Sequence, residues 1–581
     1  AERGVDVDIN AIPLDDEKSY ELYASAKTIA VFQVESSGMM DALRRMKPTC
    51  IEDIIALVAL YRPGPMENIP AFCEVKNGLR KRELMHPSID HILDETQGII
   101  VYQEQVMQIA QEMAGYSLGG ADLLRRAMGK KIQAEMDKEK PKFLKGSADH
   151  GVDKAKANEV WNLLDKFANY GFNKSHAAAY AVVSYQTAWL KANHPVEFMA
   201  GVMNCDLHLT DKLAVYAEEV RRGLAIEIVP PCVNRSGATF SVDEGRVVYA
   251  LGALKNVGVE AMKLIVAARR ADPEDAAKGD KPFATVFDLA RRVDLKRVGK
   301  RPLEMLARAG AFDQLDPNRA RVFRSLDALT GYSAAIHDQR ASNQVSLFGE
   351  AGDDLPEPRL SPTDDWLPNE RLTEEHKAIG FYLSGHPLDD YMGPLKRKDV
   401  ITLAEVTARA ERAPLVAKLA GSISGKQERK SARGNRFAFV QLSDPTGLYE
   451  VTVFSDTLEA AREHIEPGTN VVLTVEANME ADQLKLLARA VSPVDTVAAD
   501  AGSMGIRVFV DQASAVTSVA ALLEKATAEA KTHARGPVQL CLMAPDLPGE
   551  VEISLGERFH VNPQIKGAIK SLGGVVAVED V

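Results

Sequence analysis

Residues Leu118 to Lys131, with the sequence LGGADLLRRAMGKK, combine a glycine pair, a predicted helix start and four cations. Gly119 and Gly120 would let the backbone approach a ligand closely, and a helix beginning near Ala121 would direct free N–H groups at that ligand. Guanidinium and ammonium groups suit phosphate oxygens, so the segment predicts a polyphosphate site. The four cations are Arg125, Arg126, Lys130 and Lys131. The alternative is a solvated basic helix in which Asp122 pairs with Arg126 at i, i+4 spacing.

Three further motifs accompany this segment: residues 59–65 (ALYRPGP), 97–107 (QGIIVYQEQVM) and 169–185 (NYGFNKSHAAAYAVVSY). Together the four motifs resemble the fingers of bacterial replicative DNA polymerases. Specifically, the sequence from Ile12 to about Val494 is similar to the C-terminal half of the DNA polymerase III alpha subunit, a C-family polymerase. The resemblance implies that Arg125 and Arg126 hold the triphosphate of the incoming dNTP, and that the adjacent lysines reinforce their charge. Preorganised cations would stabilise the negative charge that builds on the departing pyrophosphate.

The motif at 169–185 contains a second polar cluster that leads into a predicted helix. Lys174 and His176 are predicted to contact the nucleotide or the primer–template, with a purely structural role as the alternative for the histidine. Ser175 has two open roles, the helix N-cap and a ligand contact, of which the cap is the predicted one. Tyr180 has two open interpretations, which are stacking on a base and packing in an alanine-rich core.

Polymerases transfer nucleotides with Mg²⁺ ions held by carboxylates. In the resembled family these carboxylates lie in a palm motif, PDxDxDF, and on a later palm strand, and the motif does not occur here. We therefore expect a fragment that lacks the palm and is inactive alone, with Mg²⁺ bound by palm residues outside it. Asp6 and Asp8, which would share one face of a strand, are predicted to be surface residues.

Residues Leu251 to Val266 predict a helix-hairpin-helix, whose hairpin would contact DNA phosphates through backbone N–H groups. The predicted DNA-binding residues are Lys255, Asn256 and Gly258, and Asn tolerates the left-handed conformation that such a turn needs. An ordinary αα-hairpin remains the alternative. A second, weaker copy is predicted over Leu295 to Ala309.

An exposed linker between Ala341 and Leu367 contains the pentapeptide QVSLF. It fits the pattern that bacterial sliding-clamp ligands use, in which Gln344 would bind the pocket rim while Leu347 and Phe348 fill an apolar groove. The resemblance places such a motif after the helix-hairpin-helix region, which supports binding to the clamp (beta subunit).

Residues Leu415 to Val494 contain short strands separated by turns and resemble an OB-fold β-barrel. A basic loop is predicted to bind single-stranded template through Lys426, Arg429, Lys430, Arg433 and Arg436. Phe437 and Phe439, which follow the loop, are predicted to lie in the barrel core.

The predicted fold is multidomain: all-α fingers with a residual palm connection (1–225), a helix-hairpin-helix and clamp-binding domain with linker (226–400), an OB-fold (401–497) and a small α+β C-terminal domain (498–581). By resemblance the last domain would contact the clamp-loader tau subunit. The missing N-terminal part would contact a proofreading exonuclease.

Composition agrees with a soluble protein of roughly three to five domains. Hydrophobic residues make up 46% of the 581 residues, and no apolar run approaches the roughly 20 residues that span a bilayer. The first residues carry no secretory core, and the five cysteines form no C-x-x-C pair, so a cytoplasmic location and reduced thiols are expected. The net charge of −12 excludes a protein that coats nucleic acid non-specifically and leaves room for local basic patches.

Two alternatives to a replicative polymerase remain open. One is an error-prone paralogue of the same polymerase family, and the other is a non-catalytic module that binds the clamp and DNA. The sequence upstream of Ala1 would distinguish the enzyme from the binding module, because only the enzyme needs palm aspartates.

Overall fold

The computed structural model describes residues 4–129, 133–167, 171–270, 281–341, 355–430, 434–480, 483–499, 505–529, 535–543 and 551–581. Contacts divide the chain into two compact units. The first contains Ala1–Val202 and Arg222–Ala225, and the second contains Met203–Arg221 and Ile226–Val581. None of the helices within the described ranges is long and apolar enough to cross a membrane.

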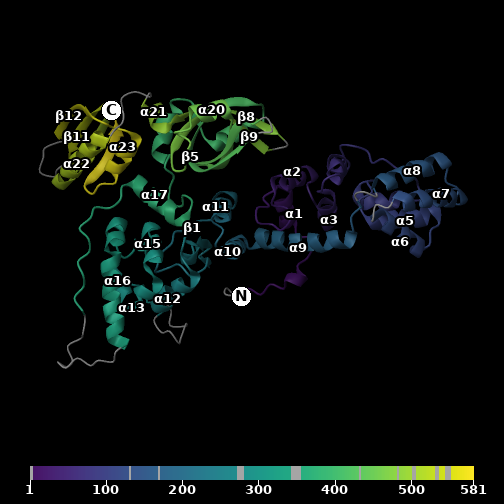
Figure 1. The fold of residues 1–581 in the computed structure, drawn as a ribbon, viewed down its shortest axis with the longest axis horizontal. Helices are drawn as coiled ribbons and strands as arrows, with labels where there is room; N and C mark the ends of the chain where they lie inside the picture. Colours follow the sequence, from purple (N-terminus) through teal and green to yellow (C-terminus); the bar gives the residue numbers. More distant parts are fainter. Residues whose placement is uncertain are drawn as a thin grey trace. The chain divides into compact units, whose positions relative to one another are not determined.

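The first unit is helical, as predicted, apart from an isolated bridge between Tyr102 and Phe172. Its helices are α1 (Glu17–Ala24), α2 (Ser37–Met46), α3 (Ile51–Leu60), α4 (Ile69–Lys76), α5 (Gln103–Ala114), α6 (Leu118–Gly129), α7 (Gln133–Asp149), α8 (Lys154–Phe167) and α9 (Lys174–Asn193). In Figure 1, α9 runs alongside α1 and α3, against which it packs. Apolar side chains of α1 to α4 and α9 share one core, whereas those of α5 to α8 form another.

A buried lysine ties α9 to the loop between α1 and α2. Lys191 is 1% exposed, and its Nζ donates hydrogen bonds to the carbonyl oxygens of Lys27 (2.7 Å) and Ile29 (2.8 Å). The loop contains non-glycine residues with positive φ, namely Ala26, Ala30 and Gln33. Such backbone conformations are costly and persist where the surrounding contacts enforce them.

The second unit begins around a small sheet with the order β1-β3-β2, formed by Ile228–Val229, Arg246–Val248 and Ser241–Asp243. The chain reaches this unit through α10 (Pro195–Cys205). The helices of this part of the chain are α11 (Thr210–Glu218), α12 (Val259–Arg269), α13 (Val286–Arg292), α14 (Leu295–Val298), α15 (Lys300–Arg308), α16 (Arg319–Ala341), α17 (Pro368–Ile379) and α18 (Met392–Lys396).

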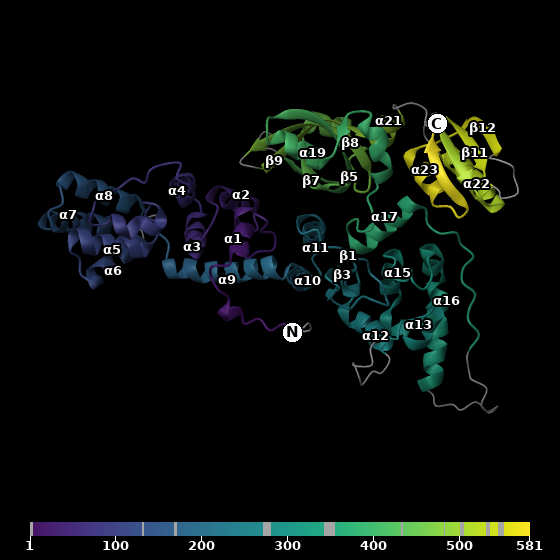
Figure 2. The ribbon, with the colours of Figure 1, turned by 180° about the vertical axis from the view of Figure 1, so that it is seen from behind.

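A closed barrel follows, seen from behind in Figure 2. Its sheet has the order β4-β5-β6-β7-β9-β8, and an additional pairing of β5 with β8 closes it. The elements are β4 (Val400–Ile401), α19 (Leu403–Ala410), β5 (Leu415–Lys430), β6 (Arg436–Asp444), β7 (Gly447–Val453), α20 (Ser455–Ala460), β8 (Asn470–Glu480) and β9 (Gln483–Pro493). Closure of β5 to β9 confirms the predicted OB-type barrel.

The last part of the chain is an α+β layer, as predicted. After α21 (Val494–Ala499), the sheet has the order β12-β11-β10-β13, formed by Val551–Phe559, Gly536–Leu542, Ile506–Val510 and Val575–Asp580. Helices α22 (Ala513–Glu529) and α23 (Pro563–Lys570) cover the face that carries Ile506 and Val508. The four domain boundaries remain predictions, because the contact-based units are larger than these domains.

We expect Lys191→Met to lower the free energy of unfolding by roughly 2–3 kcal/mol, because two partly buried carbonyl groups lose the charged donor that the buried lysine supplies. Urea unfolding measures this change. Lys18→Met, an exposed lysine on α1, should change stability by less than about 0.5 kcal/mol. Equal stability of the two variants would contradict the assigned role of Lys191.

Candidate functional site

Helix α6 begins earlier than the sequence suggested. Ser117 Oγ accepts a hydrogen bond from Gly120 N (3.2 Å), and Ser117 O accepts one from Ala121 N (2.9 Å). The helix therefore starts at Leu118, and the prediction that it begins near Ala121 or Asp122 is wrong, because a serine caps the helix before the glycine pair. A Cβ added at Gly119 would meet no atom within 4 Å among the described residues, which leaves this side of the helix open.

Asp122 binds both arginines of the predicted triphosphate site. Arg125 donates from Nε (2.9 Å) and Nη2 (2.8 Å) to Asp122 Oδ1, and Arg126 Nε lies 2.8 Å from Asp122 Oδ2. The hydrogen bond from Arg125, with the positive charge of both arginines, holds the pKa of Asp122 below its usual value. The pairing anticipated as the alternative is thus present, and triphosphate binding remains a prediction. Lys130 and Lys131 lie outside the described residues.

Gln103, the first residue of α5, connects Arg125 to the turn before α9. Its Oε1 accepts a hydrogen bond from Arg125 Nη1 (3.3 Å), and its Nε2 donates to Gly171 O (3.3 Å). Its backbone N–H donates to Phe172 O (2.9 Å). The sequence motif at 97–107 contains this glutamine, but nothing in its spacing revealed that it would join two other motifs.

Helix α9 is capped by Asn173. Asn173 Oδ1 accepts a hydrogen bond from His176 N (2.9 Å), so the prediction that Ser175 is the N-cap is wrong by two residues. Glu104 fixes the same turn, because its carboxylate accepts hydrogen bonds from Asn173 Nδ2 (2.9 Å) and Lys174 N (3.0 Å). The Lys174 ammonium group pairs with Glu95 at 2.6 Å.

A row of rings runs along α9 at i, i+4 spacing. The ring centroids are 5.4 Å apart for Phe172 and His176, 4.5 Å apart for His176 and Tyr180, and 5.6 Å apart for Tyr180 and Phe32. The Arg62 guanidinium lies 4.1 Å from the Phe172 ring centroid. Tyr180 is partly exposed and is not part of the buried core, and its ring packs against those of Phe32 and His176.

Asp6 and Asp8 are both exposed, as predicted. Asp8 Oδ1 accepts a hydrogen bond from Asn10 N (2.9 Å) and caps a short 3-10 turn, Ile9–Ala11. No group of three or more His, Cys, Asp or Glu side chains suited to a metal ion occurs among the described residues.

The predicted helix-hairpin-helix has one α-helix and one shorter turn. A 3-10 turn, Leu251–Ala253, stands where the first helix was expected, and α12 follows the hairpin. Asn256 has φ of 61°, as predicted for this position. Lys255 N donates to Ala378 O (2.8 Å), whereas within the described residues the N–H groups of Asn256 and Gly258 donate to no acceptor.

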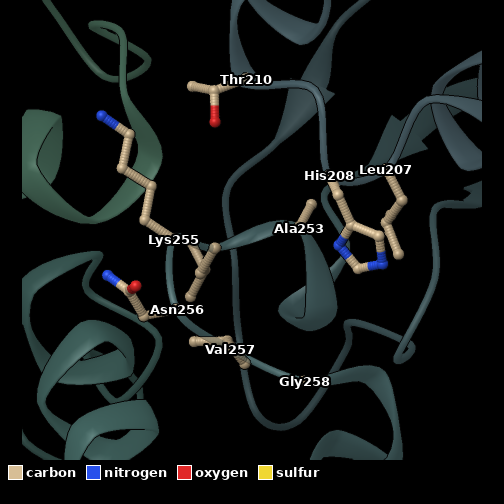
Figure 3. A pocket seen from close by; sticks show the side chains of 9 residues that line it. Leu207, His208, Thr210, Ala253, Lys255, Asn256, Val257 and Gly258 are labelled. Carbon is tan, nitrogen blue, oxygen red and sulfur yellow. The ribbon is translucent and has the colours of Figure 1, made fainter.

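The hairpin lines a pocket of about 490 Å³ (Figure 3). Its lining residues are Leu207, His208, Thr210, Ala253, Leu254, Lys255, Asn256, Val257 and Gly258. The side chains of Lys255 and Asn256 occupy one side of the pocket in this view and that of His208 the other. Hydroxyl, imidazole and ammonium groups beside free N–H groups can bind a phosphate.

The second predicted copy consists of two α-helices joined by a glycine turn. Gly299, with φ of 93°, separates α14 from α15. Lys300, next to this turn, pairs with Asp327 at 2.8 Å. Gln344, Leu347 and Phe348 of the predicted clamp motif lie outside the described residues.

The basic segment of the barrel differs from the predicted loop. Lys426, Arg429 and Lys430 belong to β5, and Arg436 begins β6. Lys426 pairs with Glu466 at 2.8 Å, so its charge is already balanced. Arg433 lies outside the described residues.

The prediction that Phe437 and Phe439 lie in the barrel core is wrong. Side chains alternate along β6, and Ala438 and Val440 occupy the core instead. Both phenylalanines therefore face outward, where Arg429 lies 5.6 Å from the Phe439 ring centroid.

Comparisons with known proteins agree with this arrangement. Residues 1–151 match the family model of the bacterial DNA polymerase III alpha subunit finger domain, and residues 225–322 match that of the helix-hairpin-helix motif. The chain is 46% identical to DNA polymerase III subunit alpha of Caulobacter vibrioides over 583 residues, which cover all of this chain and 49% of the relative. It is 38% identical to the Vibrio cholerae protein of the same name, over 96% of this chain and 48% of that protein.

A polymerase finger domain followed by a helix-hairpin-helix and an OB-type barrel defines the class of DNA-synthesising enzymes to which these relatives belong. The chain belongs to the family of bacterial DNA polymerase III alpha subunits. It spans about half the length of the curated relatives that it matches.

Among solved structures, the second OB-fold domain of replication protein A from Methanococcus maripaludis is 15% identical, with a TM-score of 0.12. The match covers 14% of this chain and 85% of that domain. At this score, the barrel is identified from its own strand order.

We expect Asn173→Ala to destabilise the first unit by about 1 kcal/mol, because the first turn of α9 loses its cap. Ser175→Ala, an exposed position in the same turn, should change stability by less than about 0.5 kcal/mol. Thermal or urea unfolding gives both values. A larger loss for Ser175→Ala than for Asn173→Ala would reverse the assignment of the cap.

Proposed function

We propose that this chain supplies the part of a replicative DNA polymerase that holds the incoming dNTP, contacts DNA and binds the sliding clamp. The hydrogen bonds of Gln103 carry the proposal for the nucleotide. These hydrogen bonds hold Arg125 of α6 close to the turn before α9, where the aromatic rings of Phe172, His176 and Tyr180 begin. Phosphates and a base of one nucleotide could be bound there together.

On binding, the triphosphate would replace protein carboxylates as the partner of the cations. Asp122 and Glu95 neutralise Arg125, Arg126 and Lys174, and exposed ion pairs of this kind are weak and screened by salt. A triphosphate offers several oxygens to the same guanidinium forks, with more charge than one carboxylate. The arginines would then stabilise the charge that builds on the leaving pyrophosphate.

His176 and Tyr180 would contact the sugar and base of the nucleotide, because their rings continue the row that starts at the α9 cap. Aromatic faces bind bases without demanding one sequence. By the family resemblance, Lys130 and Lys131 would add positive charge to the site.

DNA contact is proposed for both hairpins and the barrel. The free N–H groups of Asn256 and Gly258 support binding of a duplex phosphate. On the barrel, Arg429, Lys430, Arg433 and Arg436 would bind the single-stranded template, and Lys426 would stay paired with Glu466.

Catalysis would require Mg²⁺, which the proposal assigns to palm carboxylates outside this chain, so the isolated chain would be inactive. The proposed setting is the cytoplasm. The proposed partners are the beta clamp through Gln344, Leu347 and Phe348, the tau subunit through the C-terminal domain, and a proofreading exonuclease through the N-terminal part of the parent.

Replacing either arginine tests the nucleotide site. In the full-length parent, Arg125→Ala or Arg126→Ala should lower kcat/KM for dNTP about 100-fold, since each removes a donor to developing charge. Arg125→Lys should lie between wild type and Arg125→Ala, because it keeps the charge and loses the fork. Arg45→Ala removes an i, i+4 ion pair with Asp41 on α2 and should leave the kinetics unchanged. Wild-type kinetics for all four variants would refute the site.

The clamp motif is tested by capture on immobilised clamp. Leu347→Ala with Phe348→Ala should abolish capture, because the two apolar anchors are lost. Ser346→Ala in the same segment should retain it. Extension of a short primer by the parent should be unaffected by any of these changes, and unaltered clamp affinity of the double variant would remove the assignment.

A further inference from the structure

The outer face of the barrel carries a cluster of aromatic rings, which we call the phenylalanine platform: Phe437, Phe439 and Phe454. The ring centroids of Phe437 and Phe439 are 5.4 Å apart with an interplanar angle of 81°, and those of Phe437 and Phe454 are 6.2 Å apart. Phe454 is 54% exposed, and Phe437 and Phe439 are partly exposed.

These rings contribute little to the barrel's own core. The core side chains of β6 are Ala438, Val440 and Leu442, which alternate with the platform residues. Outward positions on a half-buried strand are normally polar, so several large rings gathered on one outer face point to a ligand.

The platform lies on the part of the barrel that binds ligands in OB-folds. β6 provides Phe437 and Phe439, and Phe454 directly follows β7. β6 and β7 are the second and third strands of the barrel, and the corresponding face of OB-folds binds oligonucleotides and oligosaccharides.

Cations lie beside the rings on the same β5–β6 hairpin. Arg429 is opposite Phe437 in the β5–β6 register, and Lys430 is opposite Arg436 at the end of the same hairpin. Glu450 lies opposite Gln441, toward the other end of the strands. A bound polyanion would therefore pass over the rings and leave toward Lys430 and Arg436, away from the carboxylate.

We propose that the phenylalanine platform is a base-stacking site for single-stranded DNA, in which unpaired bases stack on the three rings while Arg429, Lys430 and Arg436 contact the phosphates. Rings accept any base, so binding would be independent of sequence. The inference rests on the proposed DNA role of the barrel and adds a contribution that charge alone does not provide.

Stacking and charge respond differently to salt, which separates them experimentally. Neutralising about three phosphates of a single strand gives a slope of about −2 in a plot of log K against log salt. Removing a ring should lower the affinity about 5- to 100-fold at every salt concentration without changing the slope. Arg429→Gln should instead reduce the slope.

The experiment measures binding of the whole chain to a labelled oligo(dT) of about 12 nucleotides by fluorescence anisotropy across salt concentrations. Phe439→Leu keeps an apolar side chain and loses the ring, and it should weaken binding. Phe439→Trp should bind at least as well as wild type. Val416→Ala, a 55% exposed apolar residue on the β8-paired part of β5, is the matched control and should behave as wild type.

Different results would contradict the phenylalanine platform and the DNA role of the barrel. Equal binding by wild type and Phe439→Leu, with Phe437→Leu also unchanged, would overturn the platform alone. If the wild-type chain binds no oligo(dT) at about 50 mM salt, the DNA role of the barrel fails as well. The nucleotide site is tested separately by the arginine variants, and duplex binding through the hairpins should be the same in wild type and Phe439→Leu.

Discussion

The contacts of Gln103 are the constraint on which the proposed nucleotide site depends. A single amide side chain and its own N–H group contact Arg125, Gly171 and Phe172, which come from segments far apart in the sequence. An amide is suited to this position because it both donates and accepts hydrogen bonds, whereas a carboxylate only accepts and an ammonium group only donates. Three motifs that are separate in the sequence are thus joined through the hydrogen bonds of one residue.

Several cations near the proposed binding sites are already paired with protein carboxylates. Arg125 and Arg126 share Asp122 as a partner, and on the barrel Lys426 is paired with Glu466. This balance fits a chain with a net charge of −12 for which selective binding of nucleic acid is proposed. Specific contact then depends on geometry and stacking more than on an excess of positive charge.

Much of the fold could be predicted from the sequence, because the spacing of apolar residues and the position of turn residues specify helices and strands. The helical first part, the barrel between Leu415 and Pro493 and the α+β layer all match their patterns. The incorrect predictions concern helix starts, where two nearby residues could each cap or begin the helix. Ser175 is a good cap, but Asn173 is placed first in the turn and is held there by Glu104. Gly119 and Gly120 suggested a helix start near Ala121, although Ser117 could already begin the helix.

The orientation of Phe437 and Phe439 could not be read from their types. A strand side chain points inward or outward by register alone, and a shift of one residue exchanges the two faces. Phenylalanine favours the inside, but small Ala438 fits the inner face of the closed barrel beside Val440. The link through Gln103 was equally hidden, because no periodic signal connects residues nearly seventy positions apart.

The pairing of Asp122 with Arg125 and Arg126 has a consequence for discrimination among small anions. A ligand must displace a carboxylate that already satisfies two guanidinium groups, so an ion with one negative charge gains almost nothing by taking its place. A ligand with three or four charges can replace the carboxylate and still have oxygens left for neighbouring donors. The two arginines of such a helix would bind monovalent anions such as chloride or acetate very weakly. They would bind anions that carry several negative charges.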